Sequence, residues 1–190
     1  MNEGAATAFS ITSLLKLNHA KSMDKRTTFL HYVVTVAKRN DESLLYFKED
    51  LPSVFKSEKV FWDYCLNGAK ELEAQLHNVI KLVLNSSRMV DIEKCDFSTK
   101  EMEILSSTYV GQFVLDAVLK INVLKQQIDT TNNSYTQLLE YFHEESIPSH
   151  EFFNVIVQFS RNFDTAKADV DADEIAKVCI YIFSHRRILT

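Results

Sequence analysis

Apolar residues recur along this chain at intervals of three and four, the spacing that places side chains on one face of an α-helix. Positions 27–38 follow the full i, i+3, i+4, i+7 order with Leu30, Val33, Val34 and Ala37. A shorter apolar cluster over 9–17 precedes them. Both segments predict amphipathic helices that need a partner to cover their apolar faces.

The first of two longer patterns runs over 52–85. Pro52 suits the first turn of a helix, where its missing N–H removes no hydrogen bond. The apolar residues then step by three and four in heptad fashion: Trp62, Cys65, Ala69, Leu72, Leu76, Val79 and Val83. Such a seam is typical of a helix packed lengthwise on another helix, and we expect one continuous helix.

The second long pattern begins at Ser98, an N-cap residue with Glu101 three positions on, as in a capping box. The apolar seam then follows: Val110, Val114, Ala117, Ile121, Leu124, Ile128, Thr131, Tyr135, Leu138 and Phe142. Polar residues over 85–97 predict a loop before it. The two helices are therefore expected to form an antiparallel hairpin.

Pro148 and Ser149 predict the start of a further helix with an aromatic stripe: Phe152, Phe153, Ile156, Phe159 and Phe163. Aromatic residues at helical spacing belong to a core more often than to a ligand site. The stretch over 170–190 either continues this helix or begins another.

Only three glycines and two prolines interrupt the 190 residues, which favours long helices over the turns of a sheet. The predicted fold class is all-α: an elongated helical bundle with a long antiparallel, coiled-coil-like hairpin. We expect a single domain with N-terminal helices over 1–51, a hairpin arm over 52–145 and a C-terminal helix over 146–190 that packs on the N-terminal helices.

The net charge is −5, which argues against general nucleic-acid binding. One segment is basic, because Asp24 is the single acid between positions 16 and 39. Its six basic residues are Lys16, Lys21, Lys25, Arg26, Lys38 and Arg39. They form either a patch that attracts an acidic partner or an ordinary solvated helix face with snorkelling lysines.

Enzymatic chemistry is not expected, with no catalytic residue, cofactor or metal. The nearest approach to a metal cluster, His143, Glu144, Glu145 and His150 around Pro148, is better interpreted as a polar helix-end loop. The three cysteines are odd in number and widely spaced, which favours reduced thiols in the cytoplasm. No apolar run is long enough to predict membrane insertion.

Several short motifs occur in a fixed order. Asn2 and Gly4 precede Phe9-Ser10-Ile11-Thr12-Ser13-Leu14-Leu15-Lys16-Leu17, and Lys21-Ser22-Met23-Asp24 precedes Thr28-Phe29-Leu30-His31-Tyr32. Later come Tyr135-Thr136-Gln137-Leu138-Leu139-Glu140-Tyr141-Phe142 and Ser149-His150-Glu151-Phe152-Phe153. In this order the motifs resemble the formin homology 2 domain, the actin-assembly module of formins. Ala8 in place of a family glycine and the acidic run over 169–174 indicate a divergent member.

The resemblance implies a head-to-tail dimer in which a lasso from one subunit wraps the post of the other. Such a dimer encircles the actin filament barbed end, nucleates filaments and stays bound as subunits add. The resemblance implies that residues 1–51 are post-like and that the chain is a partial domain beginning within the post, so we expect this fragment not to nucleate alone.

Site residues follow from the same resemblance. Lys21 matches the lysine of the family's K-S motif, which implies an actin contact, and Lys16, Lys25 and Arg26 would extend that surface. Asn2, Gly4 and Phe9 resemble the lasso-receiving dimer surface. Actin and a second formin subunit are the implied partners, in the cytoplasm and associated with the cytoskeleton. The alternative is a non-enzymatic helical-hairpin scaffold for protein–protein interaction without an actin role.

Overall fold

The computed structural model describes residues 10–21 and 27–186. Within these ranges the regular elements are helices, joined by loops and one isolated antiparallel bridge between Lys21 and Thr28. The predicted all-α class is confirmed. The 3₁₀ helices are η1 (Ile11–Asn18) and η2 (Glu42–Asp50). The α-helices are α1 (Phe29–Asn40), α2 (Pro52–Ser57), α3 (Trp62–Leu84), α4 (Thr99–Ser107), α5 (Tyr109–Phe142) and α6 (Ser149–Arg186).

The helices group into two compact units. Unit 1 contains the described parts of Met1–Val60 and Phe142–Thr190, and unit 2 is Phe61–Tyr141. The predicted division of the chain after residues 51 and 145 into post, arm and C-terminal helix stays a prediction.

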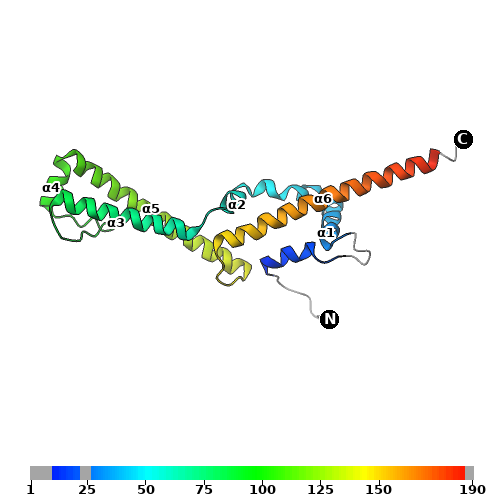
Figure 1. Cartoon of the computed structure of the whole chain (residues 1–190), viewed down its shortest axis with the longest axis horizontal. Coiled ribbons are helices and arrows are strands. Elements are labelled where there is room, and N and C mark those ends of the chain that lie inside the picture. The colour runs from blue at the N-terminus through cyan, green and yellow to red at the C-terminus, as the bar shows by residue number, and fades with distance from the viewer. Residues whose placement is uncertain (1–9, 22–26, 187–190) are drawn as a thin grey trace. The chain divides into compact units, whose positions relative to one another are not determined.

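Unit 1 is organised around α6, against which η1, α1 and α2 lie (Figure 1). Its core contains Leu30, Val34, Leu45, Phe163 and Ala166. The aromatic stripe of α6 is core, as predicted: Phe152 and Phe163 are buried, and the other three members are partly buried. The helix continues without a break to Arg186, which decides the path over 170–186.

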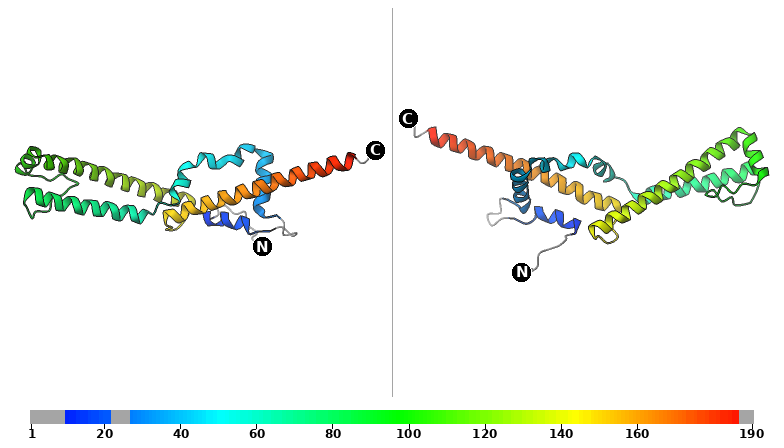
Figure 2. Two further views of the ribbon diagram at one scale, coloured as in Figure 1. Left: turned by 45° about the horizontal axis from the view of Figure 1, so that its top comes forward. Right: turned by 180° about the vertical axis from the view of Figure 1, so that it is seen from behind.

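Unit 2 is a helical hairpin in which α3 and α5 run side by side in opposite directions (Figure 2). This confirms the predicted hairpin. Its core is drawn from both helices, α4 and the loop between them: Leu76, Ile80, Val90, Ile92, Leu105, Val114, Val118 and Ile121. The heptad seam is only partly buried, since Cys65 and Leu72 are exposed.

The prediction of one continuous helix over 52–85 is wrong. The chain leaves helical geometry after α2, and α3 begins only at Trp62, with Phe61 in an extended conformation as its N-cap. Glu58, directly after α2, binds Arg161 of α6 at 3.2 Å, so α2 is tied to unit 1. Apolar periodicity did not reveal this break, because the spacing of apolar residues contains no information about a contact with a distant segment such as that of Glu58 with Arg161.

The second long helix is also interrupted. Thr108 is extended, with φ −122° and ψ 149°, and α4 and α5 are bent by 114° across it. The Thr108 hydroxyl accepts a hydrogen bond from the Gly111 N–H at 3.0 Å and so caps α5. Three consecutive hydroxyl residues over 106–108 were the available signal, since such side chains compete with helical hydrogen bonds.

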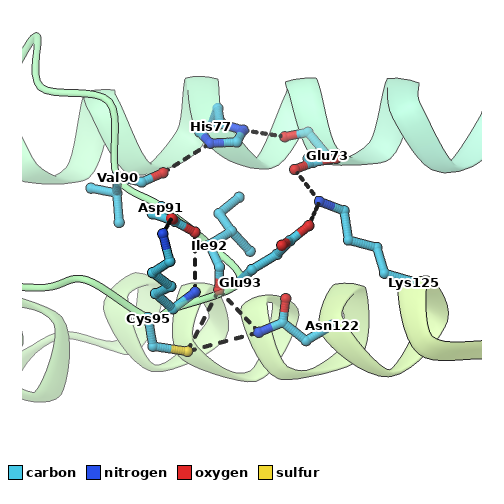
Figure 3. Close-up of polar contacts among 10 residues, drawn as sticks. Glu73, His77, Val90, Asp91, Ile92, Glu93, Cys95, Asn122 and Lys125 are labelled. Atoms are coloured by element: carbon cyan, nitrogen blue, oxygen red, sulfur yellow. Dashed lines mark hydrogen bonds and ion pairs between the residues drawn. The ribbon is translucent and has the colours of Figure 1, made fainter.

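The loop over 85–98, predicted from its polarity, fills the space between α3 and α5 (Figure 3). Val90 and Ile92 from this loop are buried in the hairpin core. Asn122 Nδ2 of α5 donates to the Ile92 carbonyl at 3.0 Å, and His77 Nε2 of α3 lies 3.1 Å from the Val90 carbonyl oxygen. The loop is thus bonded to both long helices.

Ion pairs also connect this loop to the two long helices. Lys125 Nζ of α5 lies 2.7 Å from Glu73 Oε1 of α3 and 2.7 Å from Glu93 Oε1 of the loop (Figure 3). Burial lowers the pKa of Lys125, but the hydrogen bonds to the two carboxylates outweigh burial and hold that pKa above its ordinary value. One lysine therefore joins three segments of unit 2.

The predicted capping box at Ser98 is confirmed. The Ser98 N–H donates to Glu101 Oε2 at 2.7 Å, and the Ser98 hydroxyl accepts from the Glu101 N–H. The backbone bond from Ser98, reinforced by Arg88, lowers the pKa of Glu101 below its ordinary value of 4.5. A lowered folded-state pKa means that this stabilisation is complete above pH 4.5 and is lost as the pH falls through the folded-state value.

We therefore expect Glu101→Gln to melt at a lower temperature than the wild-type chain at neutral pH, and the difference to shrink towards pH ~3. Thermal melting followed by circular dichroism across that range measures it. Glu103→Gln, an exposed position on the same helix, is the control. A difference between wild type and Glu101→Gln that stays constant with pH would contradict the role of the charge.

Within the described ranges, no single helix combines the length and apolar composition needed to cross a membrane. Only the bent pair α4 and α5 passes that test together, on length and composition.

Candidate functional site

Lys21 lies between η1 and α1 and is the last described residue before 22–26. Its backbone forms the antiparallel bridge with Thr28, and the Phe29 N–H donates to the Ala20 carbonyl at 2.7 Å. The residue itself is exposed. The structure therefore places Lys21 in a backbone bridge with its side chain exposed, and its contact with actin stays a prediction.

Lys16 is exposed in the last turn of η1. The Lys16 carbonyl accepts hydrogen bonds from the N–H groups of His19 and Ala20, which ends η1 and leads the chain to Lys21. The other predicted site residues, Lys25, Arg26, Asn2, Gly4 and Phe9, lie outside the described residues. Two members of the predicted actin-binding set are thus placed within one short segment of unit 1.

An open groove of about 540 Å³ lies beside Lys21, between α1 and the distal part of α6. Its apolar floor includes Phe29 and Tyr32, which are 48% and 62% exposed and whose ring centroids are 5.7 Å apart. Its charged lining residues are the basic Lys21, Arg39 and Lys177 and the acidic Asp173 and Glu174, of which Glu174 binds Lys38. Such a groove offers aromatic surface together with charged side chains of both signs.

Lys38 belongs to the basic segment, but unlike Lys21 its ammonium group is already bound within unit 1. Its ammonium group binds Asp171 at 2.5 Å and Glu174 at 2.7 Å, both on α6. The hydrogen bond to Asp171, then that to Glu174, raises the pKa of Lys38 well above its ordinary value. This lysine therefore serves the packing of α1 on α6.

The acidic run over 169–174 makes ion pairs within unit 1. Besides the contacts to Lys38, Asp169 Oδ2 lies 3.3 Å from His31 Nε2. The other ring nitrogen of His31 bonds to Thr28 and completes a capping box at the start of α1. The acidic residues therefore bind α1, whose N-cap anchors Lys21.

The polar cluster around Pro148 forms the turn between α5 and α6, as predicted. His143 has a positive φ of 52° after the end of α5, and the Glu144 carboxylate accepts a hydrogen bond from the Ile11 N–H at the start of η1. Among the residues that the structure describes, no group of three His, Cys, Asp or Glu side chains could hold a metal ion.

The sequence alone does not indicate one surface that contains Phe29, Tyr32, Arg39 and Lys177. Phe29 and Tyr32 stand within a motif of α1, but Lys177 comes from α6, about 140 residues away in sequence. Phe29 and Tyr32 are spaced i, i+3 on α1 and lie outside its buried face. This spacing was the one feature of the sequence that could have indicated that they share a surface. The arrangement suits binding of a protein surface through aromatic contacts and charge.

Comparison with known proteins identifies the class. The family model described as "Formin Homology 2 Domain" matches residues 1–164, so the chain belongs to this family, and the resemblance is confirmed. Formin-E of Dictyostelium discoideum is 23% identical over 165 residues, which is 86% of this chain and 10% of the relative.

Two animal relatives give the same result. Protein diaphanous homolog 3 of Mus musculus is 27% identical over 184 residues, covering 93% of this chain and 15% of the relative. Formin-like protein 2 of Homo sapiens is 25% identical over 168 residues, covering 87% of this chain and 14% of the relative. The chain thus spans only 10% to 15% of the length of these three relatives.

Proposed function

We propose that this chain is an actin-binding part of a formin that nucleates actin filaments and processively caps their barbed ends as a dimer. The observation that carries the proposal is the match of the formin homology 2 family over 1–164. The anchored, exposed Lys21 beside an aromatic groove supports a contact with an acidic protein surface. The mechanism is binding and geometry, without covalent chemistry.

Lys21 contributes positive charge at the contact, and Lys16, Lys25 and Arg26 extend it. Charges at the border of an interface mainly accelerate association and fix its register. Asn2, Gly4 and Phe9 receive the lasso of a second formin subunit. The protein acts in the cytoplasm on the actin cytoskeleton, and residues 1–190 alone bind actin without nucleating it.

The test uses a chimera in which residues 1–164 replace the matching part of the formin homology 2 domain of mouse diaphanous homolog 3. We expect the chimera to alter barbed-end elongation from actin seeds, and Lys21→Ala to weaken its apparent affinity about tenfold, or ~1.4 kcal/mol. Lys120→Ala in α5, an exposed lysine paired only with its helical neighbour Asp116, is the matched control. The chain of residues 1–190 is assayed beside them.

If a folded, dimeric chimera leaves barbed-end growth unchanged, the actin role fails. Equal losses for Lys21→Ala and Lys120→Ala would remove the assignment of Lys21 but not the actin role. Activity that falls steeply with added salt in the wild type and less steeply in Lys21→Ala is a further expected sign of a charged contact.

A helical-hairpin scaffold without an actin role is the second candidate. It is favoured by the exposed apolar residues at the bend between α4 and α5, where Tyr109, Val110 and Phe113 are all more than half exposed. A chimera that is inactive on actin but loses a protein partner on Phe113→Asp would favour this alternative.

A further inference from the structure

His31 connects the start of α1 with α6 through both nitrogen atoms of its ring. Nδ1 lies 3.1 Å from the backbone nitrogen of Thr28, the N-cap residue of α1, and 2.9 Å from the Thr28 hydroxyl oxygen. Nε2 lies 3.3 Å from Asp169 Oδ2 of α6. The His31 side chain is only 15% exposed, so unit 1 holds the ring between these two partners.

These contacts define the protonation state of the ring. A backbone N–H can only donate, so Nδ1 accepts from Thr28 and carries no proton. Nε2 then carries the proton and donates it to the Asp169 carboxylate. The geometry therefore requires a neutral ring protonated at Nε2. A doubly protonated ring has a donor at each nitrogen and loses the bond from the Thr28 N–H.

That bond lies next to the backbone bridge of Lys21. The capping box holds Thr28 in an extended conformation, with φ −105° and ψ 168°, and in this conformation Thr28 pairs with Lys21. The Phe29 N–H donates to the Ala20 carbonyl in the same bridge. Loss of the capping bond frees the first turn of α1 and weakens the bridge, because the two share Thr28.

Charged groups of both signs surround the ring. A positive charge on His31 would be attracted to Asp169, but it would stand at the N3 position of α1, where the helix dipole opposes it. The other charged residues of the groove that His31 lines are Lys21, Arg39, Asp173, Glu174 and Lys177. Neither η1 nor η2, which also pack on α1, adds a charged side chain to that lining among the described residues. Protonation therefore strengthens the contact of His31 with α6 and breaks its contact with the start of α1.

We propose that His31 is a pH-sensitive positioning residue for Lys21, whose neutral ring holds the bridge between Lys21 and Thr28 and whose protonation releases it. Histidine is the side chain that ordinarily changes charge between about pH 8 and pH 5, so the release occurs near neutral pH. The effect on the bridge stands on the contacts of unit 1, whereas its consequence for actin rests on the proposed function.

The first test is NMR spectroscopy of residues 1–190 beside His31→Gln and His31→Ala. Glutamine at N3 accepts the N-cap N–H without titrating, as in a capping box, and alanine accepts no bond. We expect the His31 ring, assigned by its absence in His31→Gln, to be protonated at Nε2 at about pH 7.5.

Hydrogen exchange then follows the Thr28 and Phe29 amides as the ring titrates. From about pH 7.5 to about pH 5.5, their protection should fall about fivefold in the wild type and not at all in His31→Gln. In His31→Ala it should be low throughout. His77→Gln, which removes a histidine of unit 2, is the matched control and should keep the wild-type pH dependence.

An Nδ1-protonated ring at neutral pH overturns the proposal. So does protection at Thr28 and Phe29 that is independent of pH in the wild type, or that falls equally in His31→Gln.

The second test links the bridge to actin, in a longer chimera that carries residues 1–186 and so retains Asp169. We expect its apparent affinity for barbed ends to fall with pH relative to the His31→Gln chimera in the same buffers, a comparison that removes the pH dependence of actin itself. In a Lys21→Ala background, His31→Gln should make no difference.

A His31 effect that persists without Lys21 overturns the positioning role, because the residue then acts by another route. A chimera without any effect on barbed ends contradicts the proposed function alone, since hydrogen exchange at Thr28 and Phe29 decides independently whether His31 controls the bridge.

Discussion

Gly111→Ala is expected to destabilise unit 2 by about 3 kcal/mol, the upper part of the range for an overpacked site. Gly111 is buried in the first turn of α5, where the chain returns after the bend at Thr108. A Cβ atom there would lie 2.2 Å from the carbonyl oxygen and 2.5 Å from the Cα of Leu105. Both are backbone atoms, so no rotation of a side chain relieves the clash.

The consequence extends beyond one contact. Leu105 is fully buried in the hairpin core, and Gly111 N–H is the donor that the Thr108 hydroxyl uses to cap α5. Moving α4 away from α5 to admit a methyl group would disturb both. The close approach of the two helices at the bend thus requires glycine at this position.

Gly68→Ala supplies the matched control. Gly68 lies inside α3, and a Cβ atom at this position would meet no atom within 4 Å. Alanine in a helix interior is favoured over glycine by roughly 0.5–1 kcal/mol, so this variant should be slightly more stable than the wild type. Urea unfolding followed by circular dichroism measures both, and a loss below ~1 kcal/mol for Gly111→Ala would contradict the steric argument.

Leu30→Ala is expected to lower the free energy of unfolding of unit 1 by about 3–4 kcal/mol. Leu30 has no exposed surface and packs in the core with Leu45 and Phe163. Truncation removes the transfer free energy of the buried atoms and leaves a cavity that helices pinned by the Lys38 ion pairs cannot easily close.

The adjacent residue tests whether burial, and not merely loss of a side chain in α1, causes the effect. Phe29 has the larger side chain but is 48% exposed on the groove, so Phe29→Ala should cost less than ~1.5 kcal/mol. In the actin assay the order should reverse under conditions where both variants are folded, because Phe29 borders the groove beside Lys21. Equal stability losses for the two variants would contradict the assignment of Leu30 to the core.

The motif order from Asn2 to Phe153 led to the family, and the match over 1–164 confirms it. The groove could not be predicted in the same way. Its residues come from α1 and from α6, and nothing in the sequence near Lys21 indicates that Lys177 lies on the same surface. Likewise, the count of basic residues could not show that Lys38 is held by Asp171 and Glu174.

The sequence by itself determined the features that depend on interactions between neighbouring residues. Apolar spacing of three and four fixed the all-α class and the hairpin, Ser98 and Glu101 fixed the start of α4, and the polar run over 85–97 fixed the loop. The helical spacing, the cap and the polar loop each depend on interactions within a few residues, so each can be recognised in one stretch of chain.

Only the tertiary structure decided the breaks between α2 and α3 and between α4 and α5, and the burial of Val90 and Ile92 between two helices. These depend on contacts between segments far apart in sequence, such as Glu58 with Arg161 and Gly111 with Leu105. Helical periodicity continues across both points. The break after α2 has its contact in a distant segment, whereas at Thr108 the hydroxyl residues over 106–108 add a local contribution.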